Sequence, residues 1–177
     1  MRVVVIGGTG HIGSYLMPRL AGCGYETVCV SRRQRQPYFV DERWAMVEHA
    51  VIDRAVEEQR GRFGERIAAL RPNVVIDLTC YTLESAVQLS NGLAGRVDHL
   101  IHCGTIWVHG PSVEVPTTED AHEWRVGVSD RDAAVTLDHL RHSPNCSIAK
   151  ARSRLNYAPR YSSLAAVQDA LALLRQL

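Results

Sequence analysis

The first residues of the chain combine a continuous apolar run with a cluster of glycines. Residues 3–6 read VVVI, a pattern typical of a parallel strand that is buried on both faces. Four glycines follow within seven positions, and Ile12, Leu16 and Leu20 then recur every fourth residue, which places them on one helix face. The pattern therefore predicts a strand, a glycine-rich turn and a helix in direct succession.

The rest of the chain continues this alternation of apolar runs and helical patterns. After a first helix over residues 11–21, ended by Gly22 and Gly24, we expect strands over residues 25–30, 44–52, 74–78 and 99–102. Helical patterns cover residues 55–70 and 83–93. Strands that alternate with helices in this way predict an α/β fold with a parallel sheet.

The spacing of the glycines after the first strand matches a dinucleotide-binding motif. Gly8, Gly10 and Gly13 satisfy G-x-G-x-x-G, and Gly7, Gly10 and Gly13 give G-x-x-G-x-x-G. In a strand–turn–helix context such glycines let a pyrophosphate approach the backbone, and amides at the helix start attract its charge. The motif predicts a Rossmann-like three-layer fold that binds a dinucleotide through a set of turn residues, Gly7, Thr9, Gly10, His11, Ile12 and Gly13. The alternative is a glycine-rich turn without a ligand.

Two arginines follow the second predicted strand. In dinucleotide-binding folds an acid at this place holds the adenosine ribose of NAD, whereas an arginine accommodates the 2′-phosphate of NADP. Arg32 and Arg33 stand here without an acid, and guanidinium groups bind phosphate strongly. NADP is therefore favoured over NAD, the alternative being that both arginines belong to a solvated basic loop. Thr79 and Cys80 follow another strand, at the edge where ligands bind in open α/β sheets.

Composition excludes several other classes of protein. The 177 residues are 46% hydrophobic with a formal net charge of +1, which gives no sign of a nucleic-acid or membrane-surface partner. No apolar run is long enough for a membrane span, and the first residues do not show the charged-then-apolar pattern of a signal peptide, so we expect a cytoplasmic location. The five cysteines lack C-x-x-C spacing and are expected to be reduced. His99, His102 and His109 have no accompanying ligands at zinc spacing, so no metal is expected.

Together these motifs resemble the NAD(P)-dependent epimerase/dehydratase family, the extended branch of the short-chain dehydrogenases/reductases. Residues 103–110, CGTIWVHG, resemble the family's S-S-x-x-V-Y-G stretch, with His109 in place of the tyrosine. Residues 114–120, EVPTTED, resemble its P-x-T-E-D segment, so the resemblance runs from Met1 to about Asp120. It implies that the Thr105 hydroxyl is catalytic and bonds a substrate oxygen. It also makes Asp53 a candidate contact for the adenine amino group, although Asp53 serves equally well as a helix N-cap.

The family's Tyr-x-x-x-Lys pair, its general acid/base, has no counterpart. Lys150 is the only lysine, and Cys146 stands four residues before it.

The C-terminal part resembles the far end of extended family members, in which a helix carries K-A-x-x-x-L-x-Y-x-P-R-Y-S. The matching residues here are Ser147, Ala149, Lys150, Ala151, Leu155, Tyr157, Pro159, Arg160, Tyr161 and Ser162.

The chain therefore resembles a family member that lacks an internal segment of roughly a hundred residues or more. We expect a Rossmann domain over residues 1–125 and a helical remnant of the substrate domain over residues 126–177. The resemblance implies an oxidoreductase that binds NADP(H) and a small-molecule substrate, with a nucleotide sugar as the candidate, and with impaired catalysis. Two alternatives stay open, a non-catalytic module that binds or senses NADP(H) and a fragment without a function of its own. The lost edge strand also predicts association into a homodimer.

Overall fold

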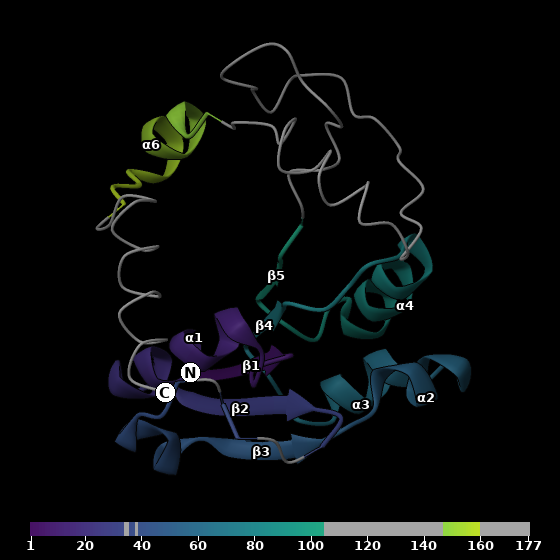
Figure 1. The fold of residues 1–177 in the computed structure, drawn as a ribbon. Helices are drawn as coiled ribbons and strands as arrows, with labels where there is room; N and C mark the ends of the chain where they lie inside the picture. The colour runs from purple at the N-terminus through teal and green to yellow at the C-terminus, as the bar shows by residue number, and fades with distance from the viewer. Residues whose placement is uncertain (34–35, 38, 105–146, 160–177) are drawn as a thin grey trace, which may run out of the picture. The chain divides into compact units, whose positions relative to one another are not determined.

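The computed structural model describes residues 1–33, 36–37, 39–104 and 147–159 (Figure 1). It contains one sheet of five parallel strands in the order β3-β2-β1-β4-β5. These are β1 (Arg2–Ile6), β2 (Glu26–Ser31), β3 (Glu48–Val51), β4 (Val74–Asp77) and β5 (His99–His102). The apolar N-terminal strand therefore lies at the centre of the sheet, as its lack of polar positions predicts. The predicted Rossmann-like α/β fold is confirmed.

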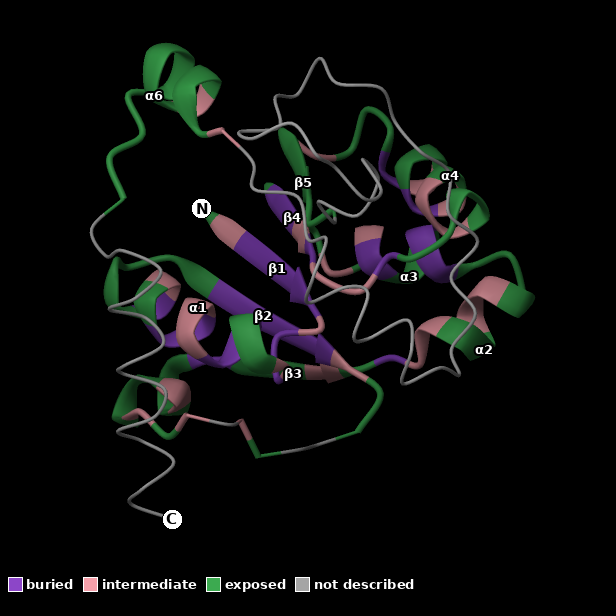
Figure 2. Cartoon of the chain, turned by 45° about the horizontal axis from the view of Figure 1, so that its top comes forward, coloured by how far each residue is buried: buried purple, intermediate pink, exposed green. Residues whose placement is uncertain are grey.

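Successive residues of β1 separate the core into two layers. Val3 and Val5 pack against Met17 and Ala21 of α1 (His11–Gly22), on one face of the sheet. Val4 and Ile6 lie on the other face, in a cluster with buried residues of α3 (Phe63–Ala68) and α4 (Leu83–Leu93). Figure 2 shows that burial is concentrated in β1, β2 and β4. Successive side chains of a strand point to opposite faces of the sheet, so one apolar run contributes residues to the core on both faces of the sheet.

Two predicted elements are wrong in their extent. Residues 44–52 do not form one strand, because the short 3₁₀ helix η1 (Glu42–Met46) precedes β3. The Asp41 carboxylate accepts a hydrogen bond from the Arg43 backbone N–H at 2.9 Å and caps that turn. Trp44 packs on the α1 side of the sheet. Its apolar side chain is therefore partly buried from a 3₁₀ turn, although the sequence pattern predicted a strand at this position.

The helical pattern over residues 55–70 also divides into two helices. The first, α2 (Arg54–Gln59), ends before Gly61, whose φ of +67° is a left-handed conformation that ends a helix. The second, α3, crosses α4 so closely that a Cβ on Gly64 would meet backbone atoms of Gly92. Gly64 therefore does not weaken the structure as a helix-breaking residue, but permits two helices to approach each other.

Residues 147–159 contain the helix α6 (Ala149–Leu155), which confirms the helix expected for the K-A-x-x-x-L segment. It ends at Asn156, whose φ is +51°. The boundary expected at residues 125–126 lies outside the described residues. No helix in the described part of the chain is long and apolar enough to cross a membrane.

Candidate functional site

The glycine-rich turn connects the centre of the sheet to α1. Gly7 has a φ of +81°, and a Cβ there would also collide with the Thr79 side chain. A Cβ on Gly13 would collide with the backbone of Gly8, so Gly13 lets the first turn of α1 lie against the loop. The Gly7 amide donates to the Val30 carbonyl at 2.9 Å, which fixes the turn to β2.

The start of α1 is arranged for an anionic ligand. The helix begins after Gly10 without a side-chain cap, and its first helical hydrogen bond runs from the Ser14 amide to the Gly10 carbonyl. The amides of the preceding helical residues therefore have no intrahelical acceptor, and the helix dipole adds positive potential there. A Cβ on Gly10 would meet only the Gly7 carbonyl, so space is open beside the turn. This geometry fits a pyrophosphate group.

A cavity of about 900 Å³ opens at the carboxyl ends of β1 to β4. Most of the residues that the sequence nominated line it, namely Gly7, Thr9, Gly10, His11, Arg32, Arg33 and Thr79. Four nominated residues are not among its lining residues: Ile12, which is exposed, Gly13, which packs on Gly8, Asp53 and Cys80. Thr105 and His109 lie outside the described residues. The structure therefore brings together the phosphate and ribose candidates in one place.

Arg32 and Arg33 lie at the cavity directly after β2, and both are exposed. Within the described part of the chain, neither guanidinium group has a hydrogen bond or an ion pair. The Arg33 backbone carbonyl instead accepts a hydrogen bond from the Ser31 hydroxyl at 2.6 Å, which shapes the loop. Within the described residues, these two cations lie directly after β2, the place at which dinucleotide-binding folds hold the adenosine ribose.

Asp53 caps α2. Its carboxylate accepts a hydrogen bond from the Val56 amide at 3.3 Å, which is the N-cap role that the sequence left open. Its neighbours Ile52 and Arg54 do line the cavity. The structure therefore favours capping as the function of the Asp53 side chain.

A buried ion pair that the sequence analysis did not predict joins Arg54, which lines the cavity, to Asp77. Arg54 donates to both carboxylate oxygens of Asp77, at 2.9 and 3.0 Å, and Asp77 is fully buried. Arg54 also donates to the Thr79 hydroxyl at 3.3 Å, and Asp77 accepts from the Thr79 amide at 3.0 Å. An acid that ends an otherwise apolar strand is a signal for such a partner, since a buried carboxylate requires a cation. The partner, 23 residues away, is shown only by the fold.

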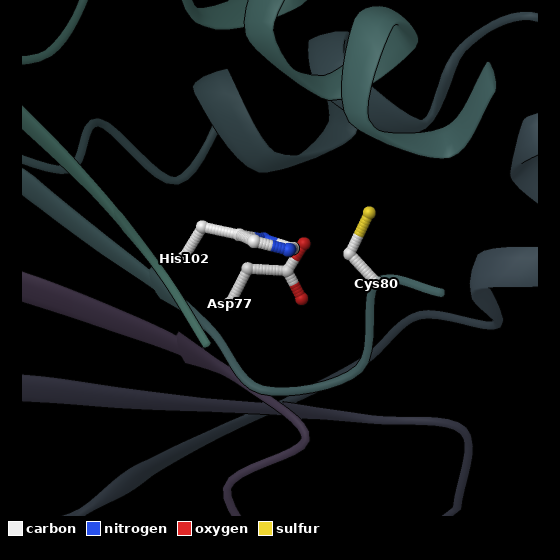
Figure 3. Close-up of side chains that lie close together, drawn as sticks. All are labelled: Asp77, Cys80 and His102. Carbon is white, nitrogen blue, oxygen red and sulfur yellow. The ribbon is translucent and has the colours of Figure 1, made fainter. Parts of the chain in front are cut away.

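Three side chains with metal-binding chemistry meet at the ends of β4 and β5 (Figure 3). The ligand atoms of Asp77, Cys80 and His102 all lie within 4.8 Å of one another. Both oxygens of Asp77 are already bound to the Arg54 guanidinium, whose positive charge opposes a metal ion. Burial raises the pKa of the Cys80 thiol, which keeps it protonated at neutral pH. The chemistry of these three side chains therefore does not favour a metal centre.

The comparisons with known proteins agree with this geometry. Residues 3–129 match the model of the NAD dependent epimerase/dehydratase family. The chain belongs to this family. A 2'-dehydrokanamycin reductase of Streptomyces kanamyceticus is 30% identical over 119 residues, which are 67% of this chain and 32% of the reductase.

Solved structures of family members show the same fold. A UDP-glucose 4-epimerase of Thermotoga maritima, solved with UDP-glucose, has a TM-score of 0.56 and 22% identity over 71% of this chain and 45% of its own. The WbmG enzyme of Bordetella bronchiseptica, solved with NAD, has a TM-score of 0.57 and 16% identity over 71% of this chain and 44% of its own. The chain thus spans about a third of the curated relative and less than half of these structures.

Proposed function

We propose that this family member binds NADP(H) in the cavity at the carboxyl ends of its strands. The observation that carries the proposal is the pair of exposed arginines, Arg32 and Arg33, which line the cavity beyond β2 without a partner in the described residues. The turn from Gly7 to Gly13 would hold the pyrophosphate, and the arginines would hold the 2′-phosphate. When bound, the nicotinamide would supply a hydride.

The test is a titration of the full chain with NADPH and NADH, followed by thermal shift and calorimetry. A ligand at a hundred times its dissociation constant stabilises the native state by about 2.7 kcal/mol. We expect clear stabilisation by NADPH and weaker stabilisation by NADH. Equal affinity for the two dinucleotides would contradict the assignment of a 2′-phosphate site.

A matched pair of variants locates the phosphate site. Replacing both Arg32 and Arg33 by alanine removes charge-assisted bonds that contribute about 1.5–3 kcal/mol each, so NADPH affinity should fall at least tenfold while NADH affinity stays. The control is Arg96→Ala, because Arg96 is exposed in the turn that precedes β5, at the opposite end of the sheet. A similar loss in both variants would indicate only a general effect of net charge.

As the catalytic role, we infer an oxidoreductase acting on a small-molecule carbonyl or carbinol, with nucleotide sugars as candidate substrates. Support comes from the family, from the reductase to which the chain is similar, and from an epimerase structure that holds UDP-glucose. The sequence has no Tyr-x-x-x-Lys pair, and loss of a general acid/base costs about a hundred- to ten-thousand-fold in rate. Turnover of NADPH with sugar ketones should therefore be severely reduced.

The second candidate, a module that binds or senses NADP(H) without turnover, is favoured by the same missing pair. Tight NADPH binding with no detectable oxidation of the bound nucleotide, whatever ketone is offered, would support it. Measurable oxidation that is lost in a Thr105→Ala variant would instead support a catalytic enzyme.

Association of two copies is a further proposal, which rests on the edge strand β5. All four residues of β5 are exposed, and Leu100 and Ile101 are apolar side chains in this exposed strand. Such an edge favours pairing with another chain. Light scattering that shows a monodisperse monomer at high protein concentration would contradict this proposal.

A further inference from the structure

The part of the chain that carries Arg32 and Arg33 is held on both sides. On the β2 side, the Ser31 hydroxyl donates a hydrogen bond to the Arg33 carbonyl at 2.6 Å. On the far side, the ring of Phe39 stacks on the ring of Tyr15 in α1, with ring centres 4.9 Å apart and 13° between the ring planes. Phe39 follows Arg33 by only six positions. A short stretch of chain that is fixed at both ends has fewer conformations than one that is fixed at one end.

Tyr15 also contacts the phosphate end of the cavity. It follows His11 by four positions, so the two side chains lie on the same face of α1. Their rings meet edge to face, with centres 6.1 Å apart and 73° between the planes. His11 lines the cavity, whereas Tyr15 and Phe39 are not among its lining residues. Tyr15 therefore connects the helix start, where a pyrophosphate fits, to the part of the chain that carries the two arginines.

The stack of Tyr15 on Phe39 lies outside the hydrophobic core. Both rings are half-buried, and neither belongs to the two core clusters of the described residues or to the side chains packed against them. The other aromatic stack on this side of the sheet differs, because Trp44, which stacks on His49 with ring centres 5.7 Å apart, packs against the core. Packing of the core therefore does not explain the contact between Tyr15 and Phe39, whereas placement of the arginines does.

We propose that Tyr15 and Phe39 are positioning residues for the 2′-phosphate of NADP(H), and that their stack makes the chain selective for this dinucleotide. The inference rests on the proposed NADP(H) site and names residues that set its selectivity without contacting the ligand. Arg32 and Arg33 are exposed, so their long side chains lose conformational freedom when they bind a phosphate. A backbone that is held in place beforehand reduces this loss. NADH has no 2′-phosphate and gains nothing from the stack.

The test is Phe39→Ala in the full chain, with both dinucleotides titrated by calorimetry. Loss of an aromatic pair should weaken NADPH binding by about two- to tenfold and leave NADH binding unchanged. Phe39→Tyr keeps a flat ring at this position and should keep the NADPH affinity of the original chain. A merely structural role of the stack would instead lower the affinity for both dinucleotides together.

A double-mutant cycle shows whether the effect passes through the arginines. When Arg32 and Arg33 are both replaced by alanine, adding Phe39→Ala should weaken NADPH binding no further, because the residues that it positions are gone. The matched control is His49→Ala, which removes the other aromatic stack. His49 is exposed on β3 and lies outside the cavity lining, so both affinities should stay unchanged in this variant.

The outcomes separate this inference from the proposal beneath it. If the original chain prefers NADPH but Phe39→Ala keeps that preference, the positioning role alone is overturned. An equal loss for NADH, or a further loss in the variant without both arginines, would overturn it as well. If the original chain binds NADPH and NADH equally, the 2′-phosphate site and its positioning residues are both overturned. If Phe39→Ala does not fold, Tyr15→Leu breaks the same stack from α1, and the same ligand comparison applies.

Discussion

The two ends of the sheet each carry an arginine that connects elements distant in sequence, and the surroundings of the two arginines differ. At the amino ends, Arg2 forms ion pairs with Glu26 of β2 and Glu48 of β3 and donates to the Leu70 carbonyl. At the carboxyl ends, Arg54 joins α2 to Asp77 at the end of β4 and to the loop that follows. Arg54 lines the cavity at the carboxyl ends of the strands, and Arg2 is not among the residues that line that cavity.

The surroundings explain the difference. Glu26 and Glu48 have side chains that are 63% and 53% exposed, so water solvates the amino-end ion pairs and each contributes little to stability. Asp77 has no exposed surface, so its carboxylate depends on Arg54 to compensate its charge. Removing either partner would leave a buried charge without a counter-ion and would destabilise the fold. The exposed Arg2 network connects neighbouring strands, whereas the Arg54 network holds a buried carboxylate beside the cavity. We therefore expect substitutions in the Arg54 network to cost more stability than substitutions in the Arg2 network.

The largest expected difference concerns thiols at the two ends. Cys29 lies beneath the glycine-rich turn, and burial raises its pKa from 9.0 to about 12, whereas Cys23 is exposed near the amino ends of the strands. A pKa raised by about three units lowers the thiolate fraction about a thousandfold at any pH below 9. Peptide mapping after iodoacetamide treatment at pH 8 should show rapid labelling of Cys23 and almost none of Cys29. Equal labelling rates for Cys23 and Cys29 in the native protein would contradict the burial of Cys29 beneath the turn.

The next comparison removes one acid at each end. Asp77→Asn leaves Arg54 with a weakened buried partner and should lower the free energy of unfolding by about 3–5 kcal/mol. Glu48→Gln should lower it by less than about 1 kcal/mol, because the ion pair is exposed. Urea denaturation of the two variants measures both effects. A similar cost for both would show that the two arginine networks are equivalent.

Gly7 and Gly24 offer a matched pair, since both have a φ of +81°. Gly24, which precedes β2, has no atom within 4 Å of the position of a Cβ, so Gly24→Ala should cost only the strain of about 1–2 kcal/mol. Gly7→Ala adds a collision with the Thr79 side chain and should cost about 1–3 kcal/mol more. NADPH binding, measured by calorimetry, should be lost in Gly7→Ala and kept in Gly24→Ala. If Gly7→Ala still binds NADPH, the proposal that the glycine-rich turn holds the pyrophosphate is contradicted.

These comparisons also show where sequence patterns suffice. The VVVI run predicted the central strand, and the glycine spacing predicted the turn, because each depends on neighbouring residues only. The strand expected at Trp44 was wrong because an apolar side chain can be buried from a 3₁₀ turn as well as from a strand. The ion pair of Arg54 was missed because its partner Asp77 is 23 residues away, and no local pattern encodes their proximity. Local geometry was thus predictable, and the buried ion pair beside the cavity was not.

The smallest expected effect is a response to salt. At about 0.5 M NaCl the Debye length is only about 4 Å, so exposed ion pairs are screened and buried ones much less. The destabilisation caused by Glu48→Gln should shrink by a few tenths of a kcal/mol between 0.05 and 0.5 M NaCl, as estimated from exposed pairs of about 0.2–1 kcal/mol. The destabilisation caused by Asp77→Asn should not change, because water and ions do not reach that carboxylate. Urea curves for the two variants at both salt concentrations measure this difference. A salt-dependent cost of Asp77→Asn would mean that the carboxyl-end network is open to solvent, and it would contradict the burial of Asp77.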